Sequence, residues 1–182
     1  YNRAMGFCIF NNVAIGAKYA YTKGIKKIAI IDWDVHHGNG TQNAFYNDPN
    51  VLYTSLHQSP AYPGTGSKNE TGEGDGEGYT LNIPLPPGTS EEIYLQEFNK
   101  NVIPALESFK PELIFISAGF DAHKDDPLAS LNLTSNGYKT LTNLLGEIAK
   151  KYSSNRIISV LEGGYNLKAL EESIKTHIEE LI

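Results

Sequence analysis

Two carboxylates and an imidazole lie at the carboxyl end of a short apolar segment at residues 28–33 and directly after it. Alternate side chains of an extended strand point to the same side, so Asp32, Asp34 and His36 are expected on one face. Buried like charges are costly unless a positive charge lies among them, and a divalent cation is the simplest source of that charge. Asp34 and His36 carry donor atoms that zinc binds in proteins. The motif alone leaves open an alternative, in which His36 caps a following helix beside solvated aspartates.

Two other apolar segments also end in side chains that could join such a site. The segment at 113–118 is followed by Asp121, and the segment at 157–161 is followed by paired glycines and Tyr165. Asp34, His36 and Asp121 together supply three ligands and leave a position open for water or substrate, as a catalytic metal site requires. The glycines would let the backbone approach the site closely and present the phenol of Tyr165.

The elements that must position these side chains follow from the apolar pattern. Short segments rich in β-branched or aromatic residues indicate buried strands at 28–33, 51–56, 80–85, 113–118 and 157–161. Amphipathic segments indicate helices at 9–22, 91–109, 134–152 and 166–181, the third capped by Thr134 or Ser135. Strands that alternate with helices predict an α/β fold with a parallel sheet covered on both faces, whose ligands gather at the carboxyl ends of the strands.

The composition limits the class of protein. The chain has 182 residues, of which 40% are hydrophobic, and a net charge of −6, so we expect one domain and no nucleic-acid or membrane partner. No stretch approaches the roughly 18 consecutive apolar residues of a membrane-spanning helix. A single cysteine, Cys8, excludes an internal disulfide framework and favours a cytoplasmic location. We expect a long solvated loop at 57–79, a buried Cys8 thiol and a solvated His177.

Five segments give the chain a family resemblance: GFCIFNNVAIGA (6–17), DWDVHHGNGT (32–41), SLHQSPAYPGTG (55–66), SAGFDAHKDDPL (117–128) and LEGGYN (161–166). In this order they resemble the histone deacetylase family, and more narrowly its class II and bacterial histone deacetylase-like amidohydrolase, or acetoin-utilisation, branch. The resemblance extends through nearly the whole chain. It implies a three-layer α/β/α fold of the arginase/deacetylase type, with residues 1–182 forming a single, partial catalytic domain.

The resemblance also implies a chemistry for the residues noted above. One zinc ion per chain would be bound by Asp34, His36 and Asp121, and water activated by the metal would hydrolyse an acetyl amide. Tyr165 would donate a hydrogen bond to the oxyanion that develops. The implied substrates are acetyl-lysine in peptides or proteins, or a related acetylated small amine.

Further positions match secondary sites of the family. The resemblance implies a structural potassium ion at Asp32, Ser55 and Leu56. It places the walls of an acyl-lysine channel at Phe7, Tyr62 and Leu128, although Phe7 is equally compatible with simple core packing. Leu128 stands where the polyamine-selective branch has a glutamate, which argues against an acetylpolyamine substrate without excluding it.

One part of the family's pattern is not found in the chain. The family uses a pair of adjacent histidines just before the GFC motif to transfer protons, and no histidine precedes His36. We therefore interpret the chain as N-terminally truncated, able to bind zinc, weakly active or inactive alone, and cytoplasmic or, in a eukaryote, nuclear. The alternatives are a non-catalytic acyl-lysine-binding module, an acetylpolyamine amidohydrolase, and an arginase-like enzyme with two manganese ions. Gly38 and His123 at the required carboxylate positions disfavour the last.

Overall fold

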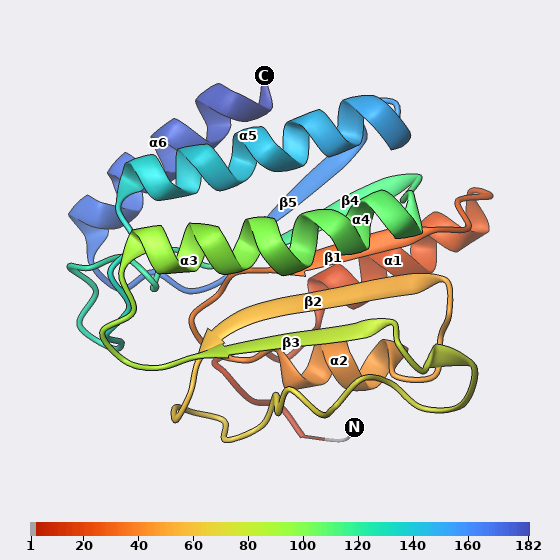
Figure 1. Cartoon of the computed structure of the whole chain (residues 1–182), viewed down its shortest axis with the longest axis horizontal. Helices are drawn as coiled ribbons and strands as arrows, with labels where there is room; N and C mark the ends of the chain where they lie inside the picture. The colour runs from red at the N-terminus through yellow and green to blue at the C-terminus, as the bar shows by residue number, and fades with distance from the viewer. Residues whose placement is uncertain (1–2) are drawn as a thin grey trace.

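The computed structural model describes residues 3–182, which fold around a parallel sheet of five strands (Figure 1). The strand order is β3-β2-β1-β4-β5. The strands are β1 (Ile28–Asp32), β2 (Val51–Gln58), β3 (Thr80–Leu85), β4 (Leu113–Ala118) and β5 (Ile157–Leu161). Every pairing between neighbours is parallel, so all the strands end at the same edge of the sheet.

Helices cover both faces of this sheet, because successive side chains of a strand point to opposite faces. In β1, Ala29 and Ile31 pack in one core cluster, whereas Ile28 and Ile30 pack in the other. The cluster of Ile28 and Ile30 lies under α1 (Asn12–Thr22) and α2 (Asn39–Phe45). The cluster of Ala29 and Ile31 lies under α3 (Glu91–Glu97), α4 (Ile103–Phe109) and α5 (Ser135–Tyr152), with α6 (Leu167–Leu181) beside α5 (Figure 1). The predicted three-layer α/β/α fold is confirmed.

The stretch predicted as one helix at 91–109 is interrupted in the middle. α3 is followed by a π-helical turn, η2 (Phe98–Val102), and then by α4, whose first turn contains Pro104. Proline has no amide hydrogen to donate to the carbonyl one turn earlier, so the regular α-helical bonding is broken here. Apolar periodicity predicted the extent of this helical stretch but not its break.

Helix α2 is not predicted by the sequence pattern, because its residues NGTQNAF lack an apolar stripe. The loop prediction at 57–79 is correct for most of that stretch, which also contains a short 3₁₀ helix, η1 (Gly74–Gly76). The loop is not solvated throughout. β2 extends to Gln58, and His57 at the start of the loop is only 1% exposed, with its ring tilted against that of His37 at a centroid distance of 4.8 Å.

Strand β5 lies at one end of the strand order and is more exposed than predicted. β1 and β4 are buried along their full length, but Ile158 and Leu161 are 44% and 56% exposed. The predicted burial of 157–161 is therefore wrong, since an apolar run indicates the strand but not which neighbours cover it. Within residues 3–182 no helix is both long enough and apolar enough to span a membrane.

Two single side chains also differ from their predicted environments. Cys8 is exposed, because its segment lies outside the packed layers. His177 is only 3% exposed, because it lies on the side of α6 that faces α5 and β5. Its Nδ1 lies 2.7 Å from Thr142 Oγ1, and its Nε2 lies 2.8 Å from Ser159 Oγ. The imidazole thereby joins α5, α6 and β5.

Candidate metal centre

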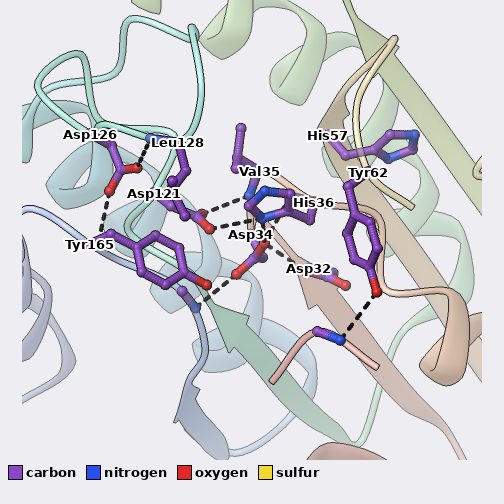
Figure 2. Close-up of polar contacts among 12 residues, drawn as sticks. Asp32, Asp34, Val35, His36, His57, Tyr62, Asp121, Asp126, Leu128 and Tyr165 are labelled. Carbon is purple, nitrogen blue, oxygen red and sulfur yellow. Dashed lines mark hydrogen bonds and ion pairs between the residues drawn. The ribbon is translucent and has the colours of Figure 1, made fainter. Parts of the chain in front are cut away.

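The loops after β1 and β4 bring the three predicted metal ligands together. β1 and β4 pair in parallel with Asp32 opposite Ser117, so the residues that follow each strand emerge side by side. One donor atom from each of Asp34, His36 and Asp121 lies within 4.8 Å of the others. His36 Nδ1 is 3.1 Å from Asp34 Oδ1 and 3.1 Å from Asp121 Oδ2, and Figure 2 shows both carboxylates beside the imidazole.

Backbone amides fix the orientation of both carboxylates. The amide of Val35 donates to Asp121 Oδ1, and the amide of His36 donates to Asp34 Oδ1, each at 2.8 Å. From the third strand end, the amide of Gly163 donates to Asp34 Oδ2, also at 2.8 Å. The cluster is therefore held by amides from two different loops before any ion binds.

The cluster concentrates negative charge and favours a cation at its centre. Asp121 is fully buried, and burial together with the neighbouring Asp34 carboxylate raises the pKa of Asp121. Hydrogen bonds to Asp121 and Asp34 raise the pKa of His36 to about 10, so the imidazole holds a proton between the carboxylates. Carboxylate oxygens and an imidazole nitrogen suit zinc, and a divalent cation can replace the charge of that proton. The three residues thus fit a zinc ion, and the structure of residues 3–182 contains no second such group of three.

Two glycines leave room for the carboxylates. A Cβ atom at Gly119 would lie 2.4 Å from Asp34 Oδ2, and one at Gly163 would lie 2.1 Å from Asp121 Oδ2. Both distances are far shorter than a carbon and an oxygen tolerate. Gly163 therefore agrees with the prediction that the paired glycines let the backbone approach the site.

Tyr165 lies in the loop between β5 and α6, at the border of the cluster. Its side chain is 38% exposed, and Figure 2 shows its hydroxyl turned toward the Asp34 carboxylate. Partial burial and the charges of Asp121 and Asp34 raise the pKa of Tyr165 to about 12. The phenol therefore keeps its proton in neutral solution and can donate a hydrogen bond.

The three predicted channel residues lie around the same cluster and are exposed. Phe7 is 90% exposed, and Tyr62 and Leu128 are each 54% exposed. The Phe7 ring meets the Tyr165 ring edge to face with centroids 6.2 Å apart, and the Tyr62 ring meets that of His36 at 6.3 Å. The alternative that Phe7 packs in the core is wrong.

The residues predicted to hold potassium are buried on neighbouring strands. Asp32 of β1 is opposite Ser55 of β2 in the strand register, and Leu56 follows. Asp32 Oδ2 accepts a hydrogen bond from the Tyr53 hydroxyl at 2.9 Å, and Ser55 Oγ lies 2.9 Å from His57 Nδ1. Both polar side chains therefore already have protein partners.

Asp32 does not share a cluster with the other two residues of its motif. β1 ends at Asp32, and residues 34–36 form bends rather than continuing the strand. The convergence of Asp34 and His36 therefore comes from this bend and not from strand alternation, which corrects the prediction. Burial and the nearby Asp34 carboxylate raise the pKa of Asp32.

Sequence reasoning missed two carboxylates near the cluster. Asp126 is 7% exposed and accepts hydrogen bonds from the amides of Tyr165 and Leu128. Burial and the charge of Asp34 raise the pKa of Glu162 to about 7. Asp126 belongs to the family-like segment 117–128, and Glu162 belongs to the family-like segment 161–166. Their location in these segments was the only signal in the sequence that could have identified them.

Comparisons with known proteins agree with this geometry. Residues 1–181 match the histone deacetylase domain. The chain belongs to the histone deacetylase family. It is 50% identical over 163 residues to a probable deacetylase of Archaeoglobus fulgidus. It is 42% identical over 167 residues to the histone deacetylase-like amidohydrolase of Pseudomonas aeruginosa.

Solved structures of histone deacetylases share the fold. The HDA15 HD domain superposes with a TM-score of 0.91 at 42% identity, over 98% of this chain and 52% of that one. The histone deacetylase Clr3 superposes with a TM-score of 0.88 at 39% identity, over 95% of this chain and 30% of that one. The chain likewise spans only 45% and 44% of the archaeal and Pseudomonas relatives, so it covers less than half the length of these two proteins.

Proposed function

We propose that this histone deacetylase chain hydrolyses an acetyl amide with one zinc ion held by Asp34, His36 and Asp121. The observation that carries the proposal is the convergence of these three donor atoms within 4.8 Å, beside the hydroxyl of Tyr165. The substrate is acetyl-lysine in a peptide or protein, or an acetylated small amine. Residues 1–182 belong to one catalytic domain.

The chain's own contribution to metal binding is to hold the ligands in place. Amides of Val35, His36 and Gly163 orient the two carboxylates, so little ordering remains to be done when an ion arrives. A bound zinc ion polarises a carbonyl oxygen and lowers the pKa of a water molecule toward neutrality. The imidazole of His36 must be neutral to act as a ligand, so binding displaces the proton that it otherwise holds.

Tyr165 donates a hydrogen bond to the oxygen of the acetyl carbonyl as negative charge develops there. Its pKa of about 12 keeps the proton on the phenol at neutral pH. A preorganised donor of this kind lowers the barrier by about 3–4 kcal/mol. Because the side chain is 38% exposed, it can reach a substrate that enters from solvent.

In this proposal the exposed side chains around Tyr165 contact the substrate. Phe7 and Tyr62 present aromatic surface beside Tyr165 and His36, which suits the methylene stem of a lysine. Leu128 adds an apolar side chain at the rim, which argues against a polyamine, whose charged nitrogens favour a carboxylate.

A potassium ion near Asp32, Ser55 and Leu56 has a structural role in this proposal. The Asp32 carboxyl group is 2% exposed and lies beside Asp34, so burial and that neighbour raise its pKa and disfavour the negative charge of its ionised form. A monovalent cation that accepts oxygen ligands from neighbouring strands would compensate this charge.

Transfer of a proton to the leaving amine requires one more group. The four histidines other than His36 are 1–4% exposed, and each is hydrogen-bonded to residues outside the metal cluster. His37 is bonded to Thr65 and Gln42, and His57 to Ser55 and Gly66. His123 is bonded to Asp125, and His177 to Thr142 and Ser159. The zinc-loaded chain should therefore bind acetylated substrate and turn it over slowly. This observation also favours the alternative of a non-catalytic acyl-lysine-binding module.

Titration calorimetry and a deacetylation assay together test the proposal. The zinc-loaded chain should bind an acetyl-lysine peptide more tightly than the unacetylated peptide, and a chelator should remove both the binding and the slow turnover. Equal affinity for the two peptides, or no bound zinc, would contradict it. Tight binding with no hydrolysis, even by a longer protein that contains the chain, would favour the binding module. An acetylpolyamine as a third ligand tests the remaining alternative.

A further inference from the structure

One buried carboxylate joins the loop that carries Tyr165 to the loop that carries Leu128. Asp126 Oδ2 accepts a hydrogen bond from the amide of Tyr165 at 2.8 Å, and Oδ1 accepts one from the amide of Leu128 at 2.9 Å (Figure 2). Leu128 is two residues further along the same loop, whereas Tyr165 is 39 residues away and follows β5. Asp126 is 7% exposed, so its carboxylate is buried and both bonds are partly buried.

The backbone of Tyr165 needs an anchor from outside its own loop. Gly164, directly before it, adopts φ +143°, a conformation in which glycine has wide freedom and imposes little on its neighbour. On the other side of Gly164, the amide of Gly163 is bonded to the candidate ligand Asp34. The Tyr165 amide is bonded to Asp126, so two carboxylates hold the chain on either side of the flexible residue.

The adjacent residue, Asp125, has a different environment. Its side chain is 60% exposed and lies 3.7 Å from His123 Nδ1, and its backbone carbonyl accepts a hydrogen bond from the Asn166 side chain at 2.9 Å. Asp125 therefore carries the same charge at nearly the same place, but its carboxylate makes no bond to either amide. It provides a matched comparison for Asp126.

We propose that Asp126 is a positioning residue that holds the Tyr165 phenol at the metal centre and ties it to the rim residue Leu128. The inference rests on the proposed function, because it assigns a geometric cause to the role of Tyr165. Hydrogen bonds to a charged acceptor are stronger than those to a neutral one, so one carboxylate can fix two loops. A displacement of a catalytic group by about 1 Å can reduce the rate about 100-fold, so such an anchor matters for chemistry even though it touches no substrate.

The test compares Asp126→Ala with Asp125→Ala in the zinc-loaded chain. Three quantities are measured: amide proton shifts and hydrogen exchange at residues 165 and 128, zinc affinity, and affinity for a fluorescent hydroxamate of lysine length. We expect Asp126→Ala to speed hydrogen exchange of both amides at least about tenfold. We also expect it to lower the affinity for the hydroxamate about 10- to 100-fold. Zinc affinity should change less than about twofold, since Asp126 contacts none of the three ligands, and Asp125→Ala should change none of these quantities.

Unchanged exchange of the Tyr165 amide in Asp126→Ala, or the same change in Asp125→Ala, would overturn the inference. Should Asp126→Ala fail to fold, a through-bond coupling between the Tyr165 amide nitrogen and the Asp126 carboxyl carbon in the unaltered chain decides the question, and its absence overturns the anchor. Failure of the proposed function is distinguishable, because amide exchange can still be measured in an unaltered chain that binds no zinc or hydroxamate. In that case faster exchange in Asp126→Ala, but not in Asp125→Ala, supports the anchor.

Discussion

The amide nitrogen of Gly163 lies 2.8 Å from Oδ2 of Asp34, although the two residues are 129 positions apart. This bond joins the loop after β5 to the loop after β1. The carbonyl of Gly163 also accepts a hydrogen bond from the amide of Phe120 at 2.7 Å, which adds the loop after β4. Three strand ends are thus interlocked around the cluster of Asp34, His36 and Asp121, so a change that displaces the backbone at Gly163 should alter metal affinity.

A methyl group at residue 163 should disrupt the metal centre without removing a ligand. In Gly163→Ala the added Cβ would lie 2.1 Å from Asp121 Oδ2 and 2.7 Å from Asp34 Oδ2, so both carboxylates must move. We expect zinc affinity, measured by competition with a chromophoric chelator, to fall about 10- to 100-fold, as for loss of a partner that orients ligands. Gly146→Ala in α5 is the control. Its Cβ meets nothing within 4 Å, so zinc affinity should stay constant while the free energy of unfolding rises by up to about 1 kcal/mol. Equal zinc affinity of Gly163→Ala and the unaltered chain would refute this prediction.

Removal of one negative charge from the cluster should lower zinc affinity more than Gly163→Ala does. Asp121→Asn keeps the shape of a fully buried side chain but replaces a charged ligand with a neutral amide. We expect zinc affinity to fall by more than about 100-fold, beyond the range for residues that only orient ligands. Metal analysis after dialysis should find one zinc per unaltered chain and almost none per variant. Asp75→Asn, an exposed position in η1, removes the same charge elsewhere and should retain the metal.

Loss of the Tyr165 hydroxyl should lower the rate of hydrolysis and leave zinc affinity unchanged. Tyr165→Phe removes the hydroxyl that Figure 2 shows turned toward Asp34. We expect the rate constant for hydrolysis of an acetyl-lysine peptide by the zinc-loaded protein to fall about 100-fold or more, with zinc affinity unchanged. Tyr19→Phe, at an exposed tyrosine of α1, is the control and should leave the rate unchanged. A variant as fast as the unaltered protein would exclude Tyr165 as the oxyanion donor.

Acid should destabilise the fold through His177. Burial lowers the pKa of His177 to about 4, whereas an unfolded histidine titrates near 6.5. Between these values the unfolded chain binds a proton that the folded chain does not, so this residue's contribution is complete above pH 6.5 and is lost as the pH falls toward 4. The loss attributable to His177 is up to about 3 kcal/mol.

Urea unfolding at several pH values checks this prediction against His177→Gln. The variant removes the titrating group, so its free energy of unfolding should be lower at pH 7 but should depend less steeply on pH between 6.5 and 4. His57 also has a pKa lowered to about 4 by burial, and therefore both proteins should retain some pH dependence in this window. Identical slopes for the two proteins would show that His177 does not contribute.

Local sequence patterns were sufficient to predict most elements of the fold. The apolar runs that became β1 and β4 could be recognised because both strands are buried on both faces, and Thr134 could be recognised as the cap of α5, where its side chain accepts from the amide of Gly137. Elements without a strong apolar pattern, such as α2, were not predictable, and neither was the π turn before α4. Local patterns report on one segment at a time, and these features depend on what lies against the segment.

The candidate ligands show where local chemistry stops being informative. Asp34, His36 and Asp121 could be named from residue type and from their positions after apolar segments, because parallel strands deliver their carboxyl ends to one edge. That β1 and β4 are neighbours, however, depends on strand order, which is decided by how helices and connections pack. The same packing decides that Asp126 meets Tyr165, that His177 is buried, and that Cys8 is exposed. Residue identity sets which bonds are chemically available, and only the folded chain, by bringing distant loops together, selects which of them form.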